Sequence, residues 1–198
     1  MIELQNIRTA LASADEEVRI SALQGLQQCV VAEKQELLFA AMGDENWRVR
    51  KEAVAVYVHA APDQHSIKLL LELLRDDDNA GLRNSAAEAA IRLGSASVPL
   101  LVSLIDDQDA EVRKFVIDIM GAIAAPAFVP LLLRSLLDPD IIVASAAAEK
   151  LGILGEPGNT GIADQLREML FLREEDLFRF SVQGALQRLA VAPKAGCS

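Results

Sequence analysis

The sequence predicts an all-α fold, a right-handed α-solenoid of about six helix pairs. The composition is 52% hydrophobic but only 4% aromatic, and Ala and Leu abound, which favours helices over strands. A short motif also recurs along the chain, in which an acid stands six residues before an arginine, as Asp44 does before Arg50. The aliphatic or aromatic residue before each such arginine position recurs every 30 to 35 residues, which indicates a stacked repeat array. These anchors are Val18, Val49, Leu82, Val112, Val143 and Phe178.

Each repeat consists of a helix A and a helix B, joined by a short acidic turn. Asp and Asn at the end of these turns can cap the first amides of helix B, and further carboxylates favour the positive end of its dipole. Apolar residues recur at steps of three and four. We expect A helices at residues 2–12, 34–42, 64–75, 97–105, 126–137 and 162–171. We expect B helices at residues 15–31, 46–60, 79–93, 109–124, 140–153 and 175–190.

Helix stops and the absence of linkers predict one domain. Glycines such as Gly94 and Gly155 fall near the ends of B helices, and prolines lie in or just after the links. No linker remains that could separate domains. We therefore expect a single array over residues 1–193 and a short polar tail over residues 194–198.

Several classes of protein are disfavoured by composition. The N-terminus lacks a signal-peptide pattern, and no apolar run reaches the roughly 20 residues of a membrane span, so a cytoplasmic location is expected. Cys29 and Cys197 lack the paired spacing of zinc sites or disulfide frameworks. The net charge of −10 opposes binding to nucleic acid.

The repeats resemble the HEAT-repeat family, in particular the short bacterial class described as phycobilisome-lyase-like. The likeness depends on three stretches, and it covers residues from about 13 to 190. It implies an armadillo-like helical fold but leaves function open, because such arrays serve as scaffolds, transport receptors, enzyme subunits and occasionally enzymes. The stretches run from Asp44 to Ala53, from Leu93 to Leu101 and from Asp107 to Arg113.

In HEAT proteins the acid and the arginine of the recurring motif commonly form a ladder of ion pairs between neighbouring repeats. The resemblance assigns this role to Asp44, Asp77, Asp107, Arg19, Arg50, Arg83 and Arg113. The pattern lapses at Ser13, where an acid is expected, at Ala144, where an arginine is expected, and at Arg173, which replaces an acid. We expect the ladder to be weaker at both ends of the array.

The residues give no catalytic, cofactor-binding or metal-binding constellation. The two histidines, His59 and His65, flank the turn at Pro62, and neither belongs to a pair with metal-ligand spacing. HEAT-type iron hydroxylases carry repeated His-Glu dyads, which this chain lacks. No glycine pattern matches a phosphate loop. Trp47, the single tryptophan, is expected to pack against the preceding helix pair.

Function is therefore expected on the surface, on the concave side that B helices line in a solenoid. Two hypotheses remain open. The first is a non-enzymatic scaffold that binds a basic or amphipathic segment of a protein partner; the second is an enzyme or enzyme subunit of the chromophore-lyase type. Ile20, Phe115 and Phe180 are expected as apolar residues on this polar face. The candidate partner-binding residues, which include a row of three acids, are Lys51, Glu52, Asn84, Glu88, Arg92, Lys114, Phe115, Asp118 and Glu149.

Overall fold

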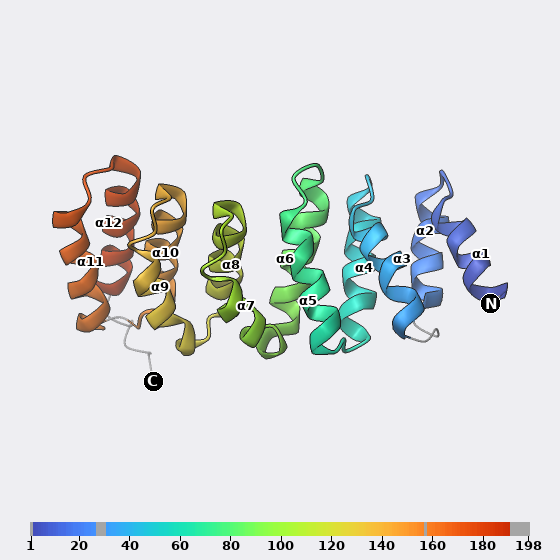
Figure 1. Cartoon of the computed structure of the whole chain (residues 1–198), viewed down its shortest axis with the longest axis horizontal. Helices are drawn as coiled ribbons and strands as arrows, with labels where there is room; N and C mark the ends of the chain where they lie inside the picture. Colours follow the sequence, from blue (N-terminus) through green and yellow to red (C-terminus); the bar gives the residue numbers. More distant parts are fainter. Residues whose placement is uncertain (1, 27–30, 157, 191–198) are drawn as a thin grey trace, which may run out of the picture. The chain divides into compact units, whose positions relative to one another are not determined.

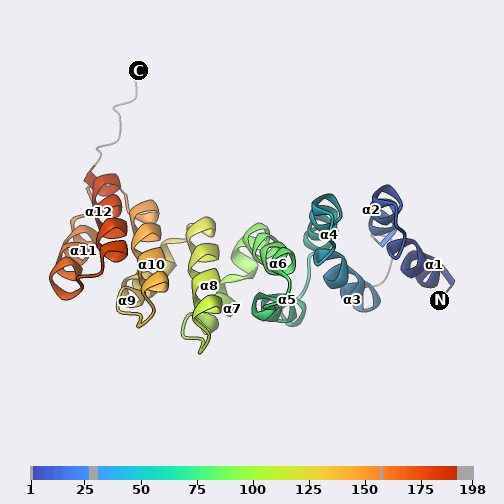
Figure 2. The same ribbon diagram turned by 90° about the horizontal axis from the view of Figure 1, so that it is seen from above.

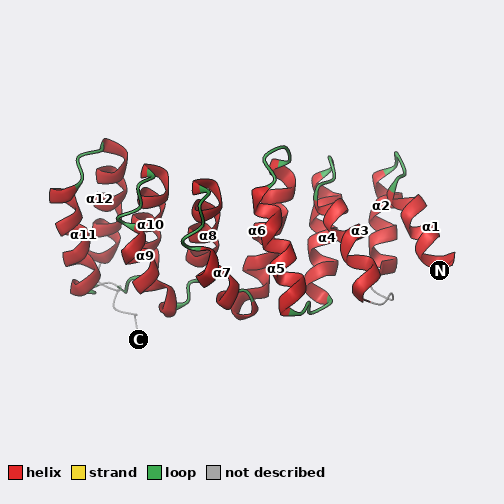
Figure 3. Cartoon of the chain, viewed as in Figure 1, coloured by secondary structure: helices red, strands yellow, loops and turns green. Residues whose placement is uncertain are grey.

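The computed structural model describes residues 2–26, 31–156 and 158–190, and no strand occurs among them (Figure 3). Short 3-10 turns at Leu73–Arg75, Gly94–Ala96 and Pro126–Phe128 precede or extend some of the α-helices. The α-helices are α1 (Ile2–Leu11), α2 (Glu16–Gly25), α3 (Val31–Met42), α4 (Trp47–His59), α5 (Gln64–Glu72), α6 (Ala80–Leu93), α7 (Val98–Leu104), α8 (Ala110–Ile123), α9 (Val129–Ser135), α10 (Ile141–Leu154), α11 (Thr160–Leu172) and α12 (Asp176–Ala190). The all-α prediction is confirmed.

The chain forms two compact units, Met1–Leu100 and Leu101–Ser198. In the first unit α3 packs on α4 and α5 on α6, while the B helices α2, α4 and α6 follow one another (Figures 1 and 2). In the second unit α9 packs on α10 and α11 on α12, and the B helices are α8, α10 and α12. Each unit is a stack of helix pairs of the α-solenoid class. The expectation of one array over residues 1–193 stays a prediction.

The acidic turns cap the B helices as the sequence predicts. The Asp109 carboxylate accepts the backbone N–H of Glu111 at 2.9 Å, and Asp140 accepts those of Ile142 and Val143 at 2.8 and 3.1 Å. Such caps satisfy amide groups that have no partner within the helix. Equivalent caps begin the B helices α2, α4 and α6 at Asp15, Asn46 and Asn79.

Small residues let neighbouring B helices approach closely. On α10, Ala144, Ala147 and Ala148 are fully buried. A Cβ added to Gly152 would lie 2.6 Å from the Cα of Ala185 on α12, closer than real Cβ atoms come. Glycine at this position is therefore required by the contact between α10 and α12, where any larger residue would separate the two helices.

Some predicted boundaries and side-chain positions need correction. The first B helix ends at Gly25 rather than at residue 31, and Cys29, Cys197 and the predicted tail lie outside the described residues. The anchors Val49, Val112, Val143 and Phe178 are buried, but Val18 is 40% exposed. Within the described ranges, no helix is both long and apolar enough to cross a membrane.

Candidate functional site

The arginine ladder is clearest in the second unit, where Arg113 joins two successive turns. Its Nη1 donates to the carbonyls of Asp107 and Gln108 in its own turn, at 2.8 and 3.1 Å. Its Nε and Nη2 donate to the two carboxylate oxygens of Asp138 in the next turn, at 2.7 and 2.8 Å. Both side chains are largely buried, and the bond to Asp138 raises the pKa of Arg113 despite the opposing effect of burial. This bidentate pair ties one repeat to the next.

The first unit repeats this arrangement at Arg19. Its Nη1 donates to the carbonyl of Ser13 at 2.8 Å, so the lapse at Ser13 costs nothing, because the contact uses the backbone. Its Nη2 donates to the Asp44 carboxylate at 3.0 Å. Arg50 makes the same backbone contact with Asp44, at 2.8 Å. Arg50 and Arg113 therefore bind the carbonyl of the acid six residues earlier, and the Asp44 carboxylate binds Arg19 of the preceding repeat.

The third turn departs from the predicted ladder. Asp77 is 84% exposed at its side chain, and its carboxylate lies 3.9 Å from Arg83. Asp76 instead accepts the backbone N–H of Asn79 at 2.8 Å, and the Asn79 amide donates to the carbonyl of Gly43 at 2.9 Å. A neutral amide thus links these two turns, where the sequence predicted a charged pair.

Arg173 compensates for the arginine that is absent at Ala144. Its Nη1 donates to the carbonyls of Leu136 and Asp138, at 3.0 and 2.9 Å. The Asp138 carbonyl is the group that an arginine at position 144 would bind, by analogy with Arg113 and Asp107. The lapses at Ala144 and Arg173 were both predicted to weaken the ladder. Instead, the Arg173 guanidinium from the next turn takes the place of the arginine that is absent at position 144.

The candidate binding residues lie on the exposed side of the B helices, which we call the B-helix face. In the first unit, a groove of about 120 Å³ lies between α4 and α6. Trp47 is 59% exposed there, so the expectation that it packs against the preceding pair is wrong; it faces the following B helix. The predicted residues Lys51, Asn84 and Glu88 line the same α4–α6 groove.

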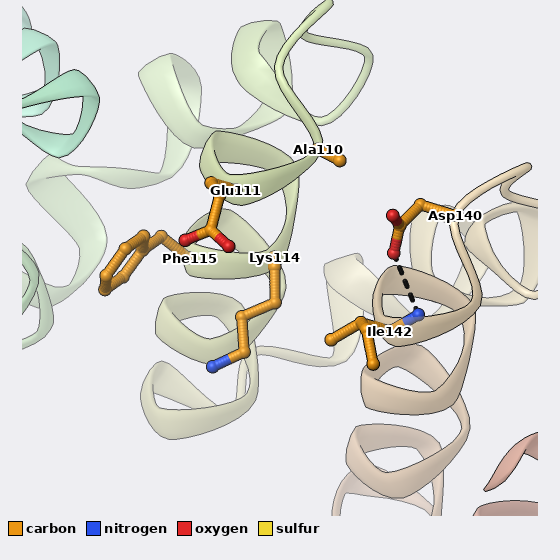
Figure 4. Close-up of a pocket in the computed structure, with 6 residues that line it drawn as sticks. All are labelled: Ala110, Glu111, Lys114, Phe115, Asp140 and Ile142. Carbon is orange, nitrogen blue, oxygen red and sulfur yellow. Dashed lines mark hydrogen bonds between the residues drawn. The ribbon is translucent and has the colours of Figure 1, made fainter. Parts of the chain in front are cut away.

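A matching groove of about 170 Å³ lies between α8 and α10 in the second unit. Figure 4 shows the predicted residues Lys114 and Phe115 on α8 and Ile142 on α10, with the Phe115 ring extending from the side of α8 that lies away from Ile142. Ile142 is 49% exposed, and the sequence analysis missed it because its α10 position carries a charge or glycine in several other repeats. Asp140 closes one end of this α8–α10 groove by capping α10 (Figure 4).

The two grooves share a stacked lysine and aromatic pair. The Lys51 ammonium lies 5.7 Å from the centre of the Trp47 ring, and the Lys114 ammonium lies 5.8 Å from the centre of the Phe115 ring. Both distances allow a cation–π contact. Lys51 and Lys114 each stand two residues after an anchor, whereas Trp47 stands two residues before its anchor and Phe115 three residues after its own, so the lysine position recurs and the aromatic position differs.

The predicted row of acids is not a row of free charges. Lys114 and Lys150 both contact Asp118, at 2.6 and 2.8 Å. Burial raises the pKa of Asp118, but the two lysines outweigh it and hold the pKa below its usual value. Glu88 lies 3.9 Å from Arg92, and Glu149 accepts a hydrogen bond from Ser181 at 3.1 Å. The row of three acids therefore does not present a free negative charge at Asp118, because Lys150 of the neighbouring helix lies beside it.

The remaining candidates are less informative. Glu52 is half-buried on α4, outside the residues that line the groove. Arg92 is exposed near the end of α6, and its guanidinium lies 3.9 Å from the Glu88 carboxylate. His59 and His65 are both exposed. Among the residues with described side chains, no group of three or more His, Cys, Asp or Glu is placed to hold a metal ion.

Solved structures with a similar fold include two TOG domains. One is from the structure described as "Crescerin uses a TOG domain array to regulate microtubules in the primary cilium", at 17% identity and a TM-score of 0.59, with 94% of this chain and 90% of that chain covered. The other is TOG3 of Drosophila melanogaster Mini spindles, at 13% identity and a TM-score of 0.57, with 94% and 95% covered. At these identities the likeness concerns the fold. A comparison with curated proteins finds no match.

The sequence itself matches the profile of HEAT repeats in three overlapping stretches. These are residues 4–91, 67–152 and 97–187. Together they span residues 4–187, which covers most of both units and reaches into the last B helix, α12. The chain belongs to the HEAT-repeat family.

Proposed function

We propose that this HEAT-repeat protein is a non-enzymatic scaffold that binds an amphipathic segment of a protein partner on its B-helix face. The observation that carries the proposal is the lysine and aromatic pair that recurs in the α4–α6 and α8–α10 grooves. Exposed aromatic residues beside a hollow are typical anchors of protein interfaces. HEAT repeats are a fold in which protein binding is common, which supports the same conclusion.

The rigidity of the helices favours such binding. The groove residues stand on helices whose first turns are capped, so little conformational entropy is lost when a partner binds. The internal pairing of Asp118 with two lysines reduces the attraction for a uniformly basic chain. An amphipathic segment, with apolar side chains for the grooves and mixed polar groups around them, fits this surface better. No cluster among the described residues favours the chromophore-lyase alternative.

Trp47 provides a direct test because it is the only tryptophan and it lines the α4–α6 groove. The full chain is titrated with helical peptides of about five turns that carry Leu on one face and either Lys or Glu on the other. Scrambled peptides of the same composition serve as controls. We expect a saturable blue shift of the Trp47 emission with at least one amphipathic peptide, because binding removes the ring from water.

Two variants show whether the effect depends on this surface. Lys51→Glu reverses the charge beside Trp47 and is expected to shift affinity severalfold according to the peptide's charge, weakening the Leu/Glu complex and strengthening the Leu/Lys complex. Leu69→Ala truncates an apolar side chain that is 37% exposed on the A helix α5 and should leave binding unchanged. If neither calorimetry nor fluorescence detects binding of any amphipathic peptide, or if scrambled peptides bind equally well, the proposed function is wrong.

A further inference from the structure

The second unit carries an apolar patch on the B helices α10 and α12, which we call the α10–α12 patch. It consists of Ile142, Leu177 and Phe180, which are 49%, 46% and 75% exposed. Ile142 and Leu177 each stand one residue before an anchor, and Phe180 stands two residues after one. Exposure of such apolar side chains to water is unfavourable in free energy. Clusters of exposed apolar side chains therefore often mark interaction surfaces.

The patch residues lie on neighbouring helices in close contact. Figures 1 and 2 both show α10 and α12 side by side, and the near contact of Gly152 with Ala185 joins their centres. The Ser181 hydroxyl, next to Phe180, donates to the Glu149 carboxylate of α10 at 3.1 Å. Ile142 also lines the α8–α10 groove, so the patch continues the candidate binding surface.

Carboxylates without an ion pair surround this patch. Asp140 stands two residues before Ile142, and Asp176 stands directly before Leu177. Glu149 accepts a hydrogen bond from Ser181, the residue after Phe180. None of these three acids forms an ion pair within the part of the chain that is described. An acid without a salt bridge therefore stands within two residues of Ile142 and of Leu177, and a third is bonded to the residue that follows Phe180.

The nearby cations are already bound elsewhere in the unit. Lys114 and Lys150 both contact Asp118, and Arg113 is bonded to Asp138. Arg173 donates to two carbonyls and to Glu175. Arg179, directly before Phe180, donates to the carbonyls of Leu170 and Arg173 rather than to an acid. The nearby cations are thus bonded to acids or to backbone carbonyls, while the three carboxylates have no ion pair, and positive side chains of a partner would pair with them.

We infer that the α10–α12 patch binds a basic amphipathic segment of a protein partner, with apolar side chains on Phe180, Leu177 and Ile142 and Lys or Arg side chains beside the carboxylates. This inference rests on the proposed function and names the chemistry of its partner. Electrostatic complementarity of this kind selects among partners and accelerates association. A second copy of the chain would bring equal carboxylates together, and its net charge of −10 opposes that contact.

The test compares the Leu/Lys peptide with the Leu/Glu peptide on the full chain and on Phe180→Ala. Calorimetry should show that the Leu/Lys peptide binds at least tenfold more tightly than the Leu/Glu peptide. Phe180→Ala should weaken the Leu/Lys complex about tenfold, because an aromatic anchor is removed. Phe180 is 75% exposed, so its truncation leaves the core intact, and circular dichroism verifies folding.

Matched control variants distinguish binding at the α10–α12 patch from nonspecific binding to exposed apolar side chains. Phe171→Ala removes an aromatic side chain that is 87% exposed on the A helix α11 and should not change binding. The double variant Glu149→Gln and Asp176→Asn should weaken the Leu/Lys complex severalfold and flatten its dependence on salt.

The outcomes also distinguish this inference from the proposed function. If amphipathic peptides bind but the Leu/Glu peptide binds as well as Leu/Lys, or Phe180→Ala has no effect, the inference is overturned and the scaffold proposal stands. If Phe171→Ala weakens binding as much as Phe180→Ala, the α10–α12 patch is not the site. If no amphipathic peptide binds, both ideas are wrong.

Discussion

At the scale of single residues, two ion pairs of the second unit differ in burial. The side chains of Arg113 and Asp138 are 11% and 9% exposed, whereas those of Arg134 and Asp106 are 54% and 72% exposed. We predict that Arg113→Ala lowers the free energy of unfolding by about 3 kcal/mol, because Asp138 loses its partner while largely buried. Arg134→Ala should cost under about 1 kcal/mol, since solvent screens an exposed pair.

Urea denaturation of both variants and of the wild-type chain gives these energies. Equal losses for the two variants would show that the ladder does not fasten the repeats. The difference between Arg113→Ala and Arg134→Ala also tests the ladder role that the resemblance to HEAT repeats assigns to Arg113.

Asp118 gives stability a dependence on pH. Burial raises the pKa of its carboxyl, but Lys114 and Lys150 lower it by more, so the folded pKa lies below the ordinary 3.8. Its contribution is therefore fully present above the unfolded pKa and is lost as pH falls through the folded pKa. We predict that Asp118→Asn costs about 1 kcal/mol at neutral pH and that the difference from wild type shrinks below pH 3.8.

Denaturation curves across the acid range measure this difference. A gap between wild type and Asp118→Asn that stays constant down to about pH 2 would contradict the paired state of Asp118. Such a result would mean that Asp118 carries a free negative charge in the row of three acids, with Glu88 and Glu149.

At the scale of helices, three glycines of the second unit face different surroundings. A Cβ at Gly152 would lie 2.6 Å from the Cα of Ala185, one at Gly121 would meet the side chain of Lys150, and one at Gly184 would meet nothing within 4 Å. We predict that Gly152→Ala destabilises the chain by about 1 to 3 kcal/mol, because backbone atoms must move. Gly184→Ala should stabilise it by about 0.5 to 1 kcal/mol through helix propensity.

Gly121→Ala is expected between these two, since the Lys150 side chain can bend away at the loss of its contact with Asp118. Denaturation of the three variants under one condition gives the order. If Gly152→Ala proves as harmless as Gly184→Ala, the close approach of α10 and α12 is wrong.

The sequence predicted most helices because their signals are local. Caps such as Asp109 and apolar steps act within one turn of the chain, and the B helices begin where these signals place them. The environment of Trp47 was missed because it depends on which neighbouring helix the ring meets. Likewise, the ion pair between Lys150 on α10 and Asp118 on α8 joins two different repeats, so the pattern within a single repeat cannot predict it. The link between Arg173 and Asp138 was missed for the same reason.

At the scale of the whole molecule, the HEAT-repeat family and the α-solenoid class are confirmed. The bacterial, phycobilisome-lyase-like class and the cytoplasmic location stay predictions. Periodicity predicts the family because the same pattern of anchors, acids and arginines recurs in successive repeats. Binding depends instead on residues that differ between repeats, such as Ile142 and Phe180, and these stand out only when their exposure is known.

Photo-crosslinking tests the binding claim most directly. A Leu/Lys amphipathic peptide with a benzophenone group on its apolar face is bound to the full chain, and mass spectrometry then identifies the linked residues. We predict crosslinks on the B-helix face, above all on α12 near Phe180 and on α10 near Ile142, with few from the scrambled peptide. Crosslinks confined to the A helices α5, α9 and α11, or an equal pattern from the scrambled peptide, would contradict a binding surface on the B helices.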